Sequence, residues 1–392
     1  MLSKITPKQN KLGVYIHWPF CVSKCPYCDF NSHVEKDIDV KQWEFAYLSE
    51  LRWMADFYKK NTQYPSLLHT VFFGGGTPSL MPVSIIERIL ETIEDLFILH
   101  PKIEITVEAN PSSSELDNLS AFKSIGVNRI SFGAQSLNPK TLSFLGREHN
   151  ARDIYKALDV AFGLFNQISA DFIYGIPGQN IGGWEDELSK IIKFDLTHIS
   201  AYQLTIEPGT QFYSRSKKGE KLTCDDDTVA DLYDLTTNVL SSHGYEIYEI
   251  SNYAKPNSQC QHNLLYWNAQ DWLGIGPGAH GRFTMPENRR WHSQTRRSPD
   301  GWLSSVQKEQ HGIEIQNEDH ISDFAKEIII MGLRLTSGIE LPDWLIGKSD
   351  FINLNWLDEF EKDGFITFNK NHIRVTKNGR LHLNSIVSKL LN

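Results

Sequence analysis

The chain has few cysteines and lacks a long apolar run. Five cysteines in 392 residues, with no apolar segment of signal-peptide length near the start, do not suit a disulfide framework and fit a reducing compartment. No uninterrupted apolar run approaches the roughly 18 to 20 residues that a membrane-spanning helix needs. These absences predict a cytoplasmic protein without a transmembrane segment, for which peripheral membrane contact stays open.

An excess of positive charge is missing as well. Lysine and arginine number 39 against 48 aspartates and glutamates, which gives a formal net charge of −9. A general binder of phosphate backbones needs a basic surface, so we expect no nucleic-acid partner. The nearest basic group surrounds Trp291 and consists of Arg289, Arg290, Arg296 and Arg297. A solvated loop is the plain interpretation of this group, and a contact to an anionic ligand is the alternative.

The scarce cysteines are concentrated in one place. Cys21, Cys25 and Cys28 fall within eight positions, directly after an apolar stretch that has the pattern of a strand. Iron–sulfur clusters are held by cysteine thiolates, commonly four, so three thiolates would leave one iron open to a small molecule with nitrogen and oxygen donors. A structural zinc site needs a second ligand pair, and the next cysteine is Cys224, so zinc is disfavoured.

Six β-rich runs alternate with helical patterns, which predicts βα units and a parallel sheet. Such a sheet is either an open doubly wound sheet or a partial barrel, and periodicity does not separate the two. Both architectures place ligands at the carboxyl ends of the strands. The predicted strands are Val14–His17, His69–Phe73, Ile103–Glu108, Arg129–Phe132, Ile168–Ile173 and His198–Leu204.

Polar groups and glycines gather where these strands end. A glycine run lets backbone approach a ligand that a side chain would block, carboxylates suit ribose hydroxyls, and arginine suits a carboxylate. The groups in question are Gly74 to Gly76, Glu108, Asn110, Gln135, Arg147 and Asp171.

The last part of the chain follows a different pattern. From about Ile321, a helix, a second helix, an alternating hairpin and a final helix predict a small α+β domain that is winged-helix-like. We therefore expect an α/β protein of three parts, with a core at 1–245, a connecting segment at 246–315 and a C-terminal domain at 316–392.

The C-x3-C-x2-C spacing, followed by Gly-Gly-Gly-Thr-Pro at Gly74 to Pro78, resembles the radical S-adenosylmethionine (radical SAM) superfamily. The resemblance implies a partial (β/α)6 barrel and a 4Fe-4S cluster on Cys21, Cys25 and Cys28. It further implies that the open iron chelates S-adenosylmethionine, which the reduced cluster can cleave to a 5′-deoxyadenosyl radical. By the same resemblance, the cofactor-binding residues are Tyr15, Tyr27, Gly75, Gly76, Thr77, Glu108, Gln135, Arg147 and Asp171.

The order of motifs along nearly the whole chain resembles the HemN/HemW group, and two features favour its HemW branch of haem chaperones. The coproporphyrinogen III dehydrogenases of the group extend the cluster motif to C-x3-C-x2-C-x-C, but this chain has Phe30 at the last position. The run from His262 to Trp267 matches the H-N-x-x-Y-W motif that HemW proteins use for haem. The resemblance implies a haem-binding role for His262, Tyr266 and Trp267.

A neutral imidazole binds iron well, so His262 is a plausible haem-iron ligand, and nearby aromatic rings can pack on a porphyrin. The thiolate of Cys260 is an alternative ligand, and a histidine satisfied by backbone hydrogen bonds is the plain alternative. The function implied is a haem chaperone that delivers haem to an acceptor, such as a respiratory protein. A coproporphyrinogen III dehydrogenase or another porphyrin-directed radical enzyme is the second possibility, and no catalytic residue is assigned.

Overall fold

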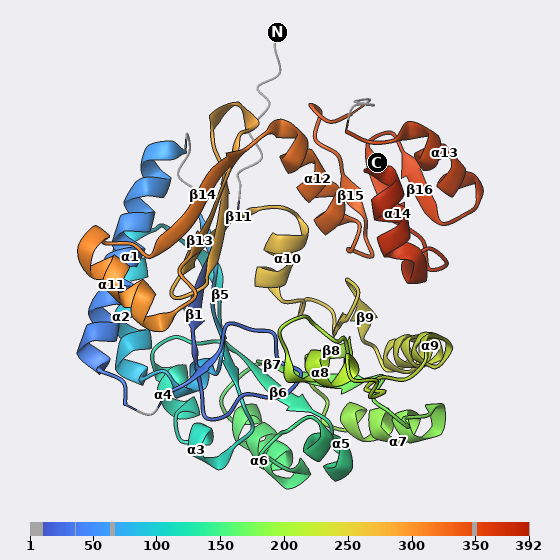
Figure 1. The fold of residues 1–392 in the computed structure, drawn as a ribbon, viewed down its shortest axis with the longest axis horizontal. Coiled ribbons are helices and arrows are strands. Elements are labelled where there is room, and N and C mark those ends of the chain that lie inside the picture. Colours follow the sequence, from blue (N-terminus) through green and yellow to red (C-terminus); the bar gives the residue numbers. More distant parts are fainter. Residues whose placement is uncertain (1–10, 36, 63–66, 347–350, 392) are drawn as a thin grey trace.

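The computed structural model describes residues 11–35, 37–62, 67–346 and 351–391 (Figure 1). In this part of the chain, twelve strands form one large sheet in the order β14-β13-β12-β11-β1-β4-β5-β6-β7-β8-β10-β9. The six predicted strands are confirmed as β1 (Leu12–Trp18), β4 (Leu68–Gly75), β5 (Leu99–Ala109), β6 (Arg129–Gln135), β7 (Gln167–Tyr174) and β8 (His198–Gln203). These strands are parallel to one another, as the alternating pattern predicts.

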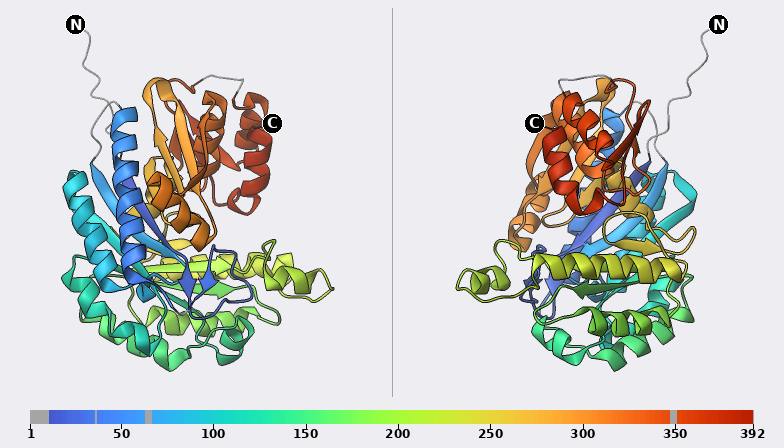
Figure 2. Two further views of the ribbon diagram at one scale, coloured as in Figure 1. Left: turned by 60° about the vertical axis from the view of Figure 1, so that its left-hand side comes forward. Right: turned by 90° about the vertical axis from the view of Figure 1, so that its right-hand side faces the viewer.

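The parallel strands form a partial barrel, with helices on the outer side of the curved sheet (Figure 2). Parallel strands need crossover connections, and helices fill that role here. The helices of this part are α1 (Val40–Asn61), α2 (Val83–Leu96), α3 (Ser113–Leu116), α4 (Leu119–Ser124), α5 (Pro139–Phe144), α6 (Ala151–Phe162), α7 (Ile181–Ile192), α8 (Gln211–Ser216) and α9 (Asp226–Ser242). The short 3-10 turn η1 (Pro78–Leu80) follows β4.

Helix α1 shows how sequence pattern and packing agree. The side chain of Asp39 accepts hydrogen bonds from the backbone amides of Lys41 and Gln42, and so caps amides that have no partner within the helix. Trp43, Tyr47 and Met54 recur at helical spacing and are buried against the sheet. Burial of this apolar face, more than helix propensity, holds such a helix in place.

The chain after α9 crosses from one edge of the sheet to the other. Strands β9 (Glu246–Ile247) and β10 (Asn252–Ala254) extend the edge at β8, and β11 (Asp271–Ile275) pairs in parallel with β1 at the opposite edge. The helix between them, α10 (Gln261–Trp267), lies inside the molecule next to the sheet (Figure 1). Beyond β11, antiparallel strands β12 (His280–Thr284), β13 (Arg290–Thr295) and β14 (Ile313–Asp319) continue the sheet, with η2 (Pro286–Asn288) and α11 (Pro299–Glu309) in the connections.

The expectation of a solvated loop around Trp291 was wrong for Arg290 and Trp291, which are buried in β13, whereas Arg289 and Arg297 are exposed outside this strand. Arg290 lies in β13 with a fully buried side chain, and its Nη1 is 2.8 Å from Oδ1 of Asp271. Its Nη2 is 3.0 Å from Oε1 of Glu327 in α12 (Ile321–Gly332). A buried charge is tolerated only when paired in this way, so Arg290 joins β11, β13 and α12 instead of facing a ligand.

The C-terminal region forms a second apolar core. It contains α12, α13 (Leu354–Lys362) and α14 (Leu383–Leu390), the turn η3 (Arg380–His382), and a three-stranded sheet of β15 (Ile339–Glu340), β17 (His372–Val375) and β16 (Ile366–Asn369). Leu264 and Trp267 of α10 pack against this core. Helix α10 therefore connects the barrel to the C-terminal domain, whose helix–hairpin–helix order agrees with the predicted winged-helix-like arrangement.

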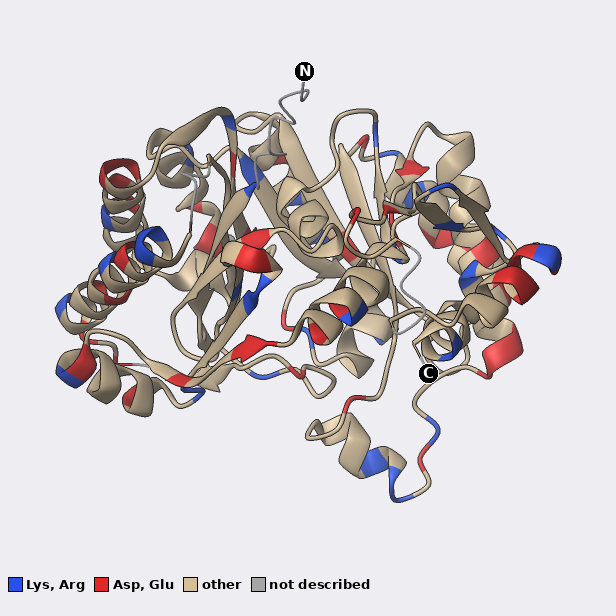
Figure 3. Cartoon of the chain, turned by 90° about the horizontal axis from the view of Figure 1, so that it is seen from above, with Lys and Arg blue, Asp and Glu red and all other residues tan. Residues whose placement is uncertain are grey.

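Charge is spread over the whole molecule. Positions of basic and of acidic residues both occur along the outer helices in Figure 3. Charged residues make up 22% of the chain, which is ordinary for a globular protein. Their positions on the outer helices agree with helix faces that contact solvent.

Candidate functional site

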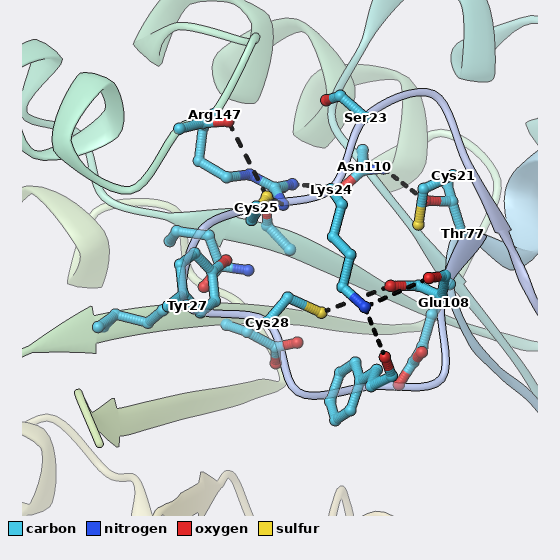
Figure 4. A pocket seen from close by; sticks show the side chains of 18 of the residues that line it. Cys21, Ser23, Lys24, Cys25, Tyr27, Cys28, Thr77, Glu108, Asn110 and Arg147 are labelled. Carbon is cyan, nitrogen blue, oxygen red and sulfur yellow. Dashed lines mark hydrogen bonds between the residues drawn. The ribbon is translucent and has the colours of Figure 1, made fainter. Parts of the chain in front are cut away.

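The three clustered cysteines lie in the loop between β1 and α1. They line a pocket of about 550 Å³ at the carboxyl ends of the parallel strands, where the sequence predicted a ligand site. Figure 4 shows their sulfur atoms around one part of this pocket, with Lys24 between them. Within the loop, Phe20–Cys21 (β2) pairs in parallel with His33–Val34 (β3), and Lys24 Nζ donates to the backbone oxygens of Phe30 and Ser32. These contacts bring both ends of the cysteine loop together.

Asn31 ties the cysteine loop to a distant part of the sheet. Its side-chain amide donates to the backbone oxygens of Pro277 and Arg297, both at 2.9 Å. Its own backbone oxygen accepts a hydrogen bond from Nε2 of His17 at 2.9 Å. Gly278 has a φ of +77°, and a Cβ there would meet Asn31 Nδ2 at 2.6 Å, so the position requires glycine.

The glycine run at the end of β4 packs against the start of the cysteine loop. A Cβ on Gly76 would lie 2.7 Å from the backbone oxygen of Phe20, and the Gly76 amide donates to the oxygen of Trp18 at 2.7 Å. The Gly75 amide donates to Oε2 of Glu108 at 3.3 Å. The sequence predicted that these amides approach a ligand. In the structure they bind the protein itself, and both glycines still line the pocket.

The residues present fit an iron–sulfur cluster. The cysteine thiols are free of disulfides, and each of two has a donor beside it: Thr77 Oγ1 donates to Cys21 Sγ at 3.3 Å, and Arg147 Nη1 donates to Cys25 Sγ at 3.3 Å. Burial raises the pKa of the Cys21 and Cys28 thiols, so forming their thiolates costs free energy. Coordination to iron would stabilise the thiolates and offset this cost. Donors to sulfur of this kind also tune a cluster's reduction potential.

Two half-buried carboxylates, Glu108 and Asp171, line the same pocket. Burial raises the pKa of Glu108 to about 8, and the charge of Asp171 adds to the shift. Burial raises the pKa of Asp171 to about 6, although Ser200, Arg129 and other neighbours oppose it. A ligand that carries positive charge would favour the ionised form of both groups. The sulfonium and ammonium groups of S-adenosylmethionine carry such charge, so the carboxylates fit the implied cofactor.

Most of the predicted cofactor residues lie together, but one stands apart. The pocket is lined by Tyr27, Gly75, Gly76, Thr77, Glu108, Gln135, Arg147 and Asp171, together with the cysteines. Gln135 has a φ of +66°, a strained conformation for a residue that is not glycine and one that is enriched at functional sites. Tyr15 is not among the lining residues that the structure describes. Its hydroxyl donates to Nδ1 of His17 at 3.0 Å, which places the tyrosine one layer behind the pocket.

Sequence reasoning missed several residues of this pocket. Tyr202 and Glu207 line it from the end of β8 and the following loop, and Ser131 lines it from β6. The signal for two of them was available, because Tyr202 lies near the end of the sixth strand and Glu207 lies in the connection that follows it. Applying the strand-end rule to β8 would have included them.

The H-N-x-x-Y-W segment lies on the other side of Tyr15, in α10. The His262 side chain is 1% exposed, and both of its ring nitrogens have partners: Nδ1 is 2.7 Å from Thr70 Oγ1, and Nε2 is 2.7 Å from the Tyr266 hydroxyl. Its ring stacks on Phe72 and Tyr15 at centroid distances of 5.0 and 6.3 Å. Burial lowers the pKa of His262 to about 3, so the imidazole is neutral.

The neighbours of His262 are equally enclosed. Cys260 is buried, and burial together with the charge of Glu104 raises its pKa to about 12, which keeps the thiol protonated. Tyr266 packs edge-on against Trp272, and Trp267 packs toward the C-terminal core with Arg334 over its ring. The haem-binding roles of His262, Tyr266 and Trp267 stay predictions, and in this conformation the three residues join β4, α10 and the C-terminal domain.

The fold and the cysteine pocket define a radical SAM protein. The profile of the radical SAM superfamily matches residues 15–191, and that of the HemN C-terminal domain matches residues 322–382. The chain belongs to the HemW family. It is 37% identical over 391 residues to the heme chaperone HemW of Haemophilus influenzae, and the alignment covers 98% of this chain and 99% of that protein. Heme chaperone HemW of Escherichia coli is 34% identical, with 98% and 99% covered.

Related proteins of two other kinds match as well. A mitochondrial radical S-adenosyl methionine domain-containing protein 1 of Bos taurus is 32% identical and covers 98% of this chain and 88% of that protein. The solved structure of coproporphyrinogen III oxidase (HemN) from Escherichia coli superposes with a TM-score of 0.81 at 21% identity, covering 97% of this chain and 90% of that one. This last likeness establishes the shared fold. Among the described residues, no helix is both long and apolar enough to span a bilayer.

Proposed function

We propose that this protein is a haem chaperone, which binds haem and delivers it to an acceptor protein, with a 4Fe-4S cluster and S-adenosylmethionine in the cysteine pocket. The observation that carries the proposal is the match of nearly the whole chain to relatives named heme chaperone HemW. A cytoplasmic location and a respiratory acceptor are parts of the same proposal.

The cysteine loop supports a chaperone over a porphyrinogen dehydrogenase. Phe30 occupies the position at which the resembling dehydrogenases carry a further cysteine, and it lines the mouth of the pocket with 58% of its surface exposed. An exposed phenylalanine offers no fourth thiolate. Its ring presents an apolar surface beside the cluster loop.

We infer that Cys21, Cys25 and Cys28 hold the cluster and that the residues lining the pocket hold S-adenosylmethionine. In that arrangement Glu108 and Asp171 face the positive charge of the cofactor. Arg147 donates from Nη1 to Sγ of Cys25 and from Nη2 to the backbone oxygen of Gly133, at 3.3 and 3.1 Å. When bound, the reduced cluster supplies one-electron chemistry to the cofactor. The residues of the pocket would hold both groups and would limit the access of bulk water to Glu108 and Asp171.

The test uses purified protein with a reconstituted cluster. Haemin titration should give a Soret band that saturates at one haem per chain. After an acceptor protein in its haem-free form is added, haem should move to the acceptor, as judged by the acceptor's own Soret band. In a parallel reaction, coproporphyrinogen III is supplied with S-adenosylmethionine and a reductant. The proposal expects no decarboxylated product; steady formation of protoporphyrinogen would overturn it in favour of the dehydrogenase. Absence of any haem binding would overturn it as well.

A further inference from the structure

Helix α1 carries a fully buried carboxylate, Glu50, which is not among the residues that line the cysteine pocket. Its Oε2 accepts hydrogen bonds from the backbone amide of Gly276 at 2.8 Å and from the indole nitrogen of Trp302 at 2.9 Å. Its Oε1 accepts from the backbone amide of Gly312 at 2.6 Å. A buried carboxylate is costly unless donors satisfy it, so these contacts hold three distant segments of the chain against α1.

Gly276 begins a short route from Glu50 to the cysteine loop. It directly follows β11, and the next residue, Pro277, supplies one of the two backbone oxygens to which the Asn31 side chain donates. Gly276 has a φ of +101°, and a Cβ there would collide with the backbone oxygen of His17. Only glycine therefore lets this segment approach the end of β1 so closely.

Gly312 begins a second route to the same loop. Its amide donates to Glu50, and its backbone oxygen accepts from the amide of Arg296 at 2.8 Å. The next residue, Arg297, supplies the second backbone oxygen that Asn31 reaches. Both acceptors of the Asn31 amide therefore lie one residue beyond a group in the hydrogen-bond network of Glu50.

The two routes are also bonded to each other. The Gly278 amide donates to the backbone oxygen of Arg296 at 2.9 Å, which joins the segment after β11 to the segment after β13. Oγ1 of Thr295 donates to the backbone oxygen of Gly276 at 2.5 Å and adds a second link. Groups in one network respond together, so we expect a change at the carboxylate to reach both acceptors of Asn31.

Asn31 lies at the end of the cysteine loop, three residues after Cys28. The next residue, Ser32, has its Oγ 4.0 Å from Cys28 Sγ, and its backbone oxygen accepts from Lys24 Nζ at 3.3 Å. The side-chain contacts of Asn31 therefore set where the Cys28 end of the loop lies.

The contacts of Glu50 call for a carboxylate and not for an amide. All three groups that meet it are donors, and an ionised carboxylate only accepts, whereas glutamine has one oxygen and an NH2 group that would face a donor. Burial raises the pKa of Glu50 to about 7, although its three hydrogen bonds oppose the rise. Glu50→Gln therefore keeps the size of the side chain and removes one acceptor.

We propose that Glu50 is a positioning residue for the iron–sulfur cluster, which acts through Gly276 and Gly312 on Asn31 and so holds the cysteine loop in the conformation that binds the cluster. This inference rests on the cluster proposed for the cysteine pocket. It gives β11 and β13, which follow the six parallel strands in the chain, a part in the metal site.

The experiment is a double-substitution cycle of Glu50→Gln, Asn31→Ala and the two combined, each with a reconstituted cluster. We measure the electron paramagnetic resonance spectrum and reduction potential of the cluster, and the rate at which a chelator removes iron. Each single variant should shift the spectrum and the potential and lose iron roughly tenfold faster, because outer partners of metal ligands are typically worth 10- to 100-fold in metal affinity. The combined variant should match the single ones, since both substitutions interrupt the same route.

Asp271→Asn is the matched control, because it changes another buried carboxylate, at the opposite end of β11 from Gly276. Asp271 pairs with Arg290 and accepts from Thr284, so the variant should lower the free energy of unfolding. Its cluster spectrum, potential and iron release should match wild type.

An unchanged spectrum and iron release in Glu50→Gln would overturn the inference, even if that variant unfolds more readily. Effects that add in the combined variant would overturn it as well, because Glu50 would then not act through Asn31. If Glu50→Gln does not fold, Glu50→Asp, whose shorter side chain keeps both acceptors but withdraws them, takes its place in the cycle with the same expectations. If wild-type protein held no cluster, the proposed cofactor itself would fail, and with it the inference.

Discussion

The two ends of the barrel are built from different chemistry. At the carboxyl ends of the strands, thiols, half-buried carboxylates and close-packed glycines line the pocket for which we propose a cluster and S-adenosylmethionine. At the amino-terminal ends, lysines, side-chain amides and two stacked histidines line a second cavity. The two ends of one sheet thus carry different side chains, and α10 with Tyr15 lies between them.

The strongest way to break this comparison is to remove one end alone. In Cys25→Ala the cluster should be lost completely, because two thiolates cannot replace the three that a cube with one open iron needs. Haem binding should survive, as judged by the Soret band. Cys224→Ala is the control and should keep full iron and sulfide content; loss of haem binding in Cys25→Ala would show that the two ends are not independent.

Replacing His262, which lies between the two ends of the barrel, should lower the free energy of unfolding. His262→Gln leaves buried partners unsatisfied, so we expect the free energy of unfolding to fall by about 2 to 4 kcal/mol at pH 7. In wild type the depressed pKa of His262 gives stability that is present above pH 6.5 and is lost as pH falls toward about 3. Denaturant unfolding at several pH values should therefore show a shallower acid loss in the variant.

His243→Gln, which changes an exposed histidine, should match wild type across that pH range. An equally steep acid loss in His262→Gln would contradict the assignment of this part of the pH dependence to His262.

The charge preference of the cysteine pocket predicts how S-adenosylmethionine binding depends on pH. Affinity should rise with pH from about 6 to about 8, because Asp171 and Glu108 must lose protons to face a cation. Glu108→Gln should weaken binding by roughly 10- to 100-fold, the worth of a charge-assisted hydrogen bond, and flatten the upper part of the profile. Isothermal titration calorimetry measures both, with Glu91→Gln on the exposed face of α2 as the control. A flat wild-type profile would refute the coupling.

Local pattern was enough to predict the parallel strands and the place of the cysteine pocket. Each strand is a short β-rich run between helical patterns, and the rule that ligands lie at carboxyl strand ends then gathers Glu108, Gln135 and Asp171. Strand β11 was not predicted, because Asp271–Ile275 follows the H-N-x-x-Y-W segment and its partner β1 lies more than 250 residues earlier. Pairing over such a separation leaves no mark in a local window.

The buried polar contacts were beyond the sequence for a similar reason. Arg290 is hidden because Asp271 and Glu327 meet it from other elements, and a basic residue alone predicts exposure. The ring of His262 is occupied by Thr70, 192 positions away. A motif identifies which residues matter, but only packing decides whether a histidine nitrogen is free.

The anchor at Asn31 sets an order of events during synthesis. The cysteine loop is among the first structured segments to be made, yet its side-chain amide bonds reach Pro277 and Arg297, which come about 250 residues later. The ribosome adds roughly 5 to 20 residues per second, so the loop waits many seconds before its far supports exist. We therefore expect cluster insertion to be a late step, and ribosome-arrested chains that end before Pro277 should hold little iron.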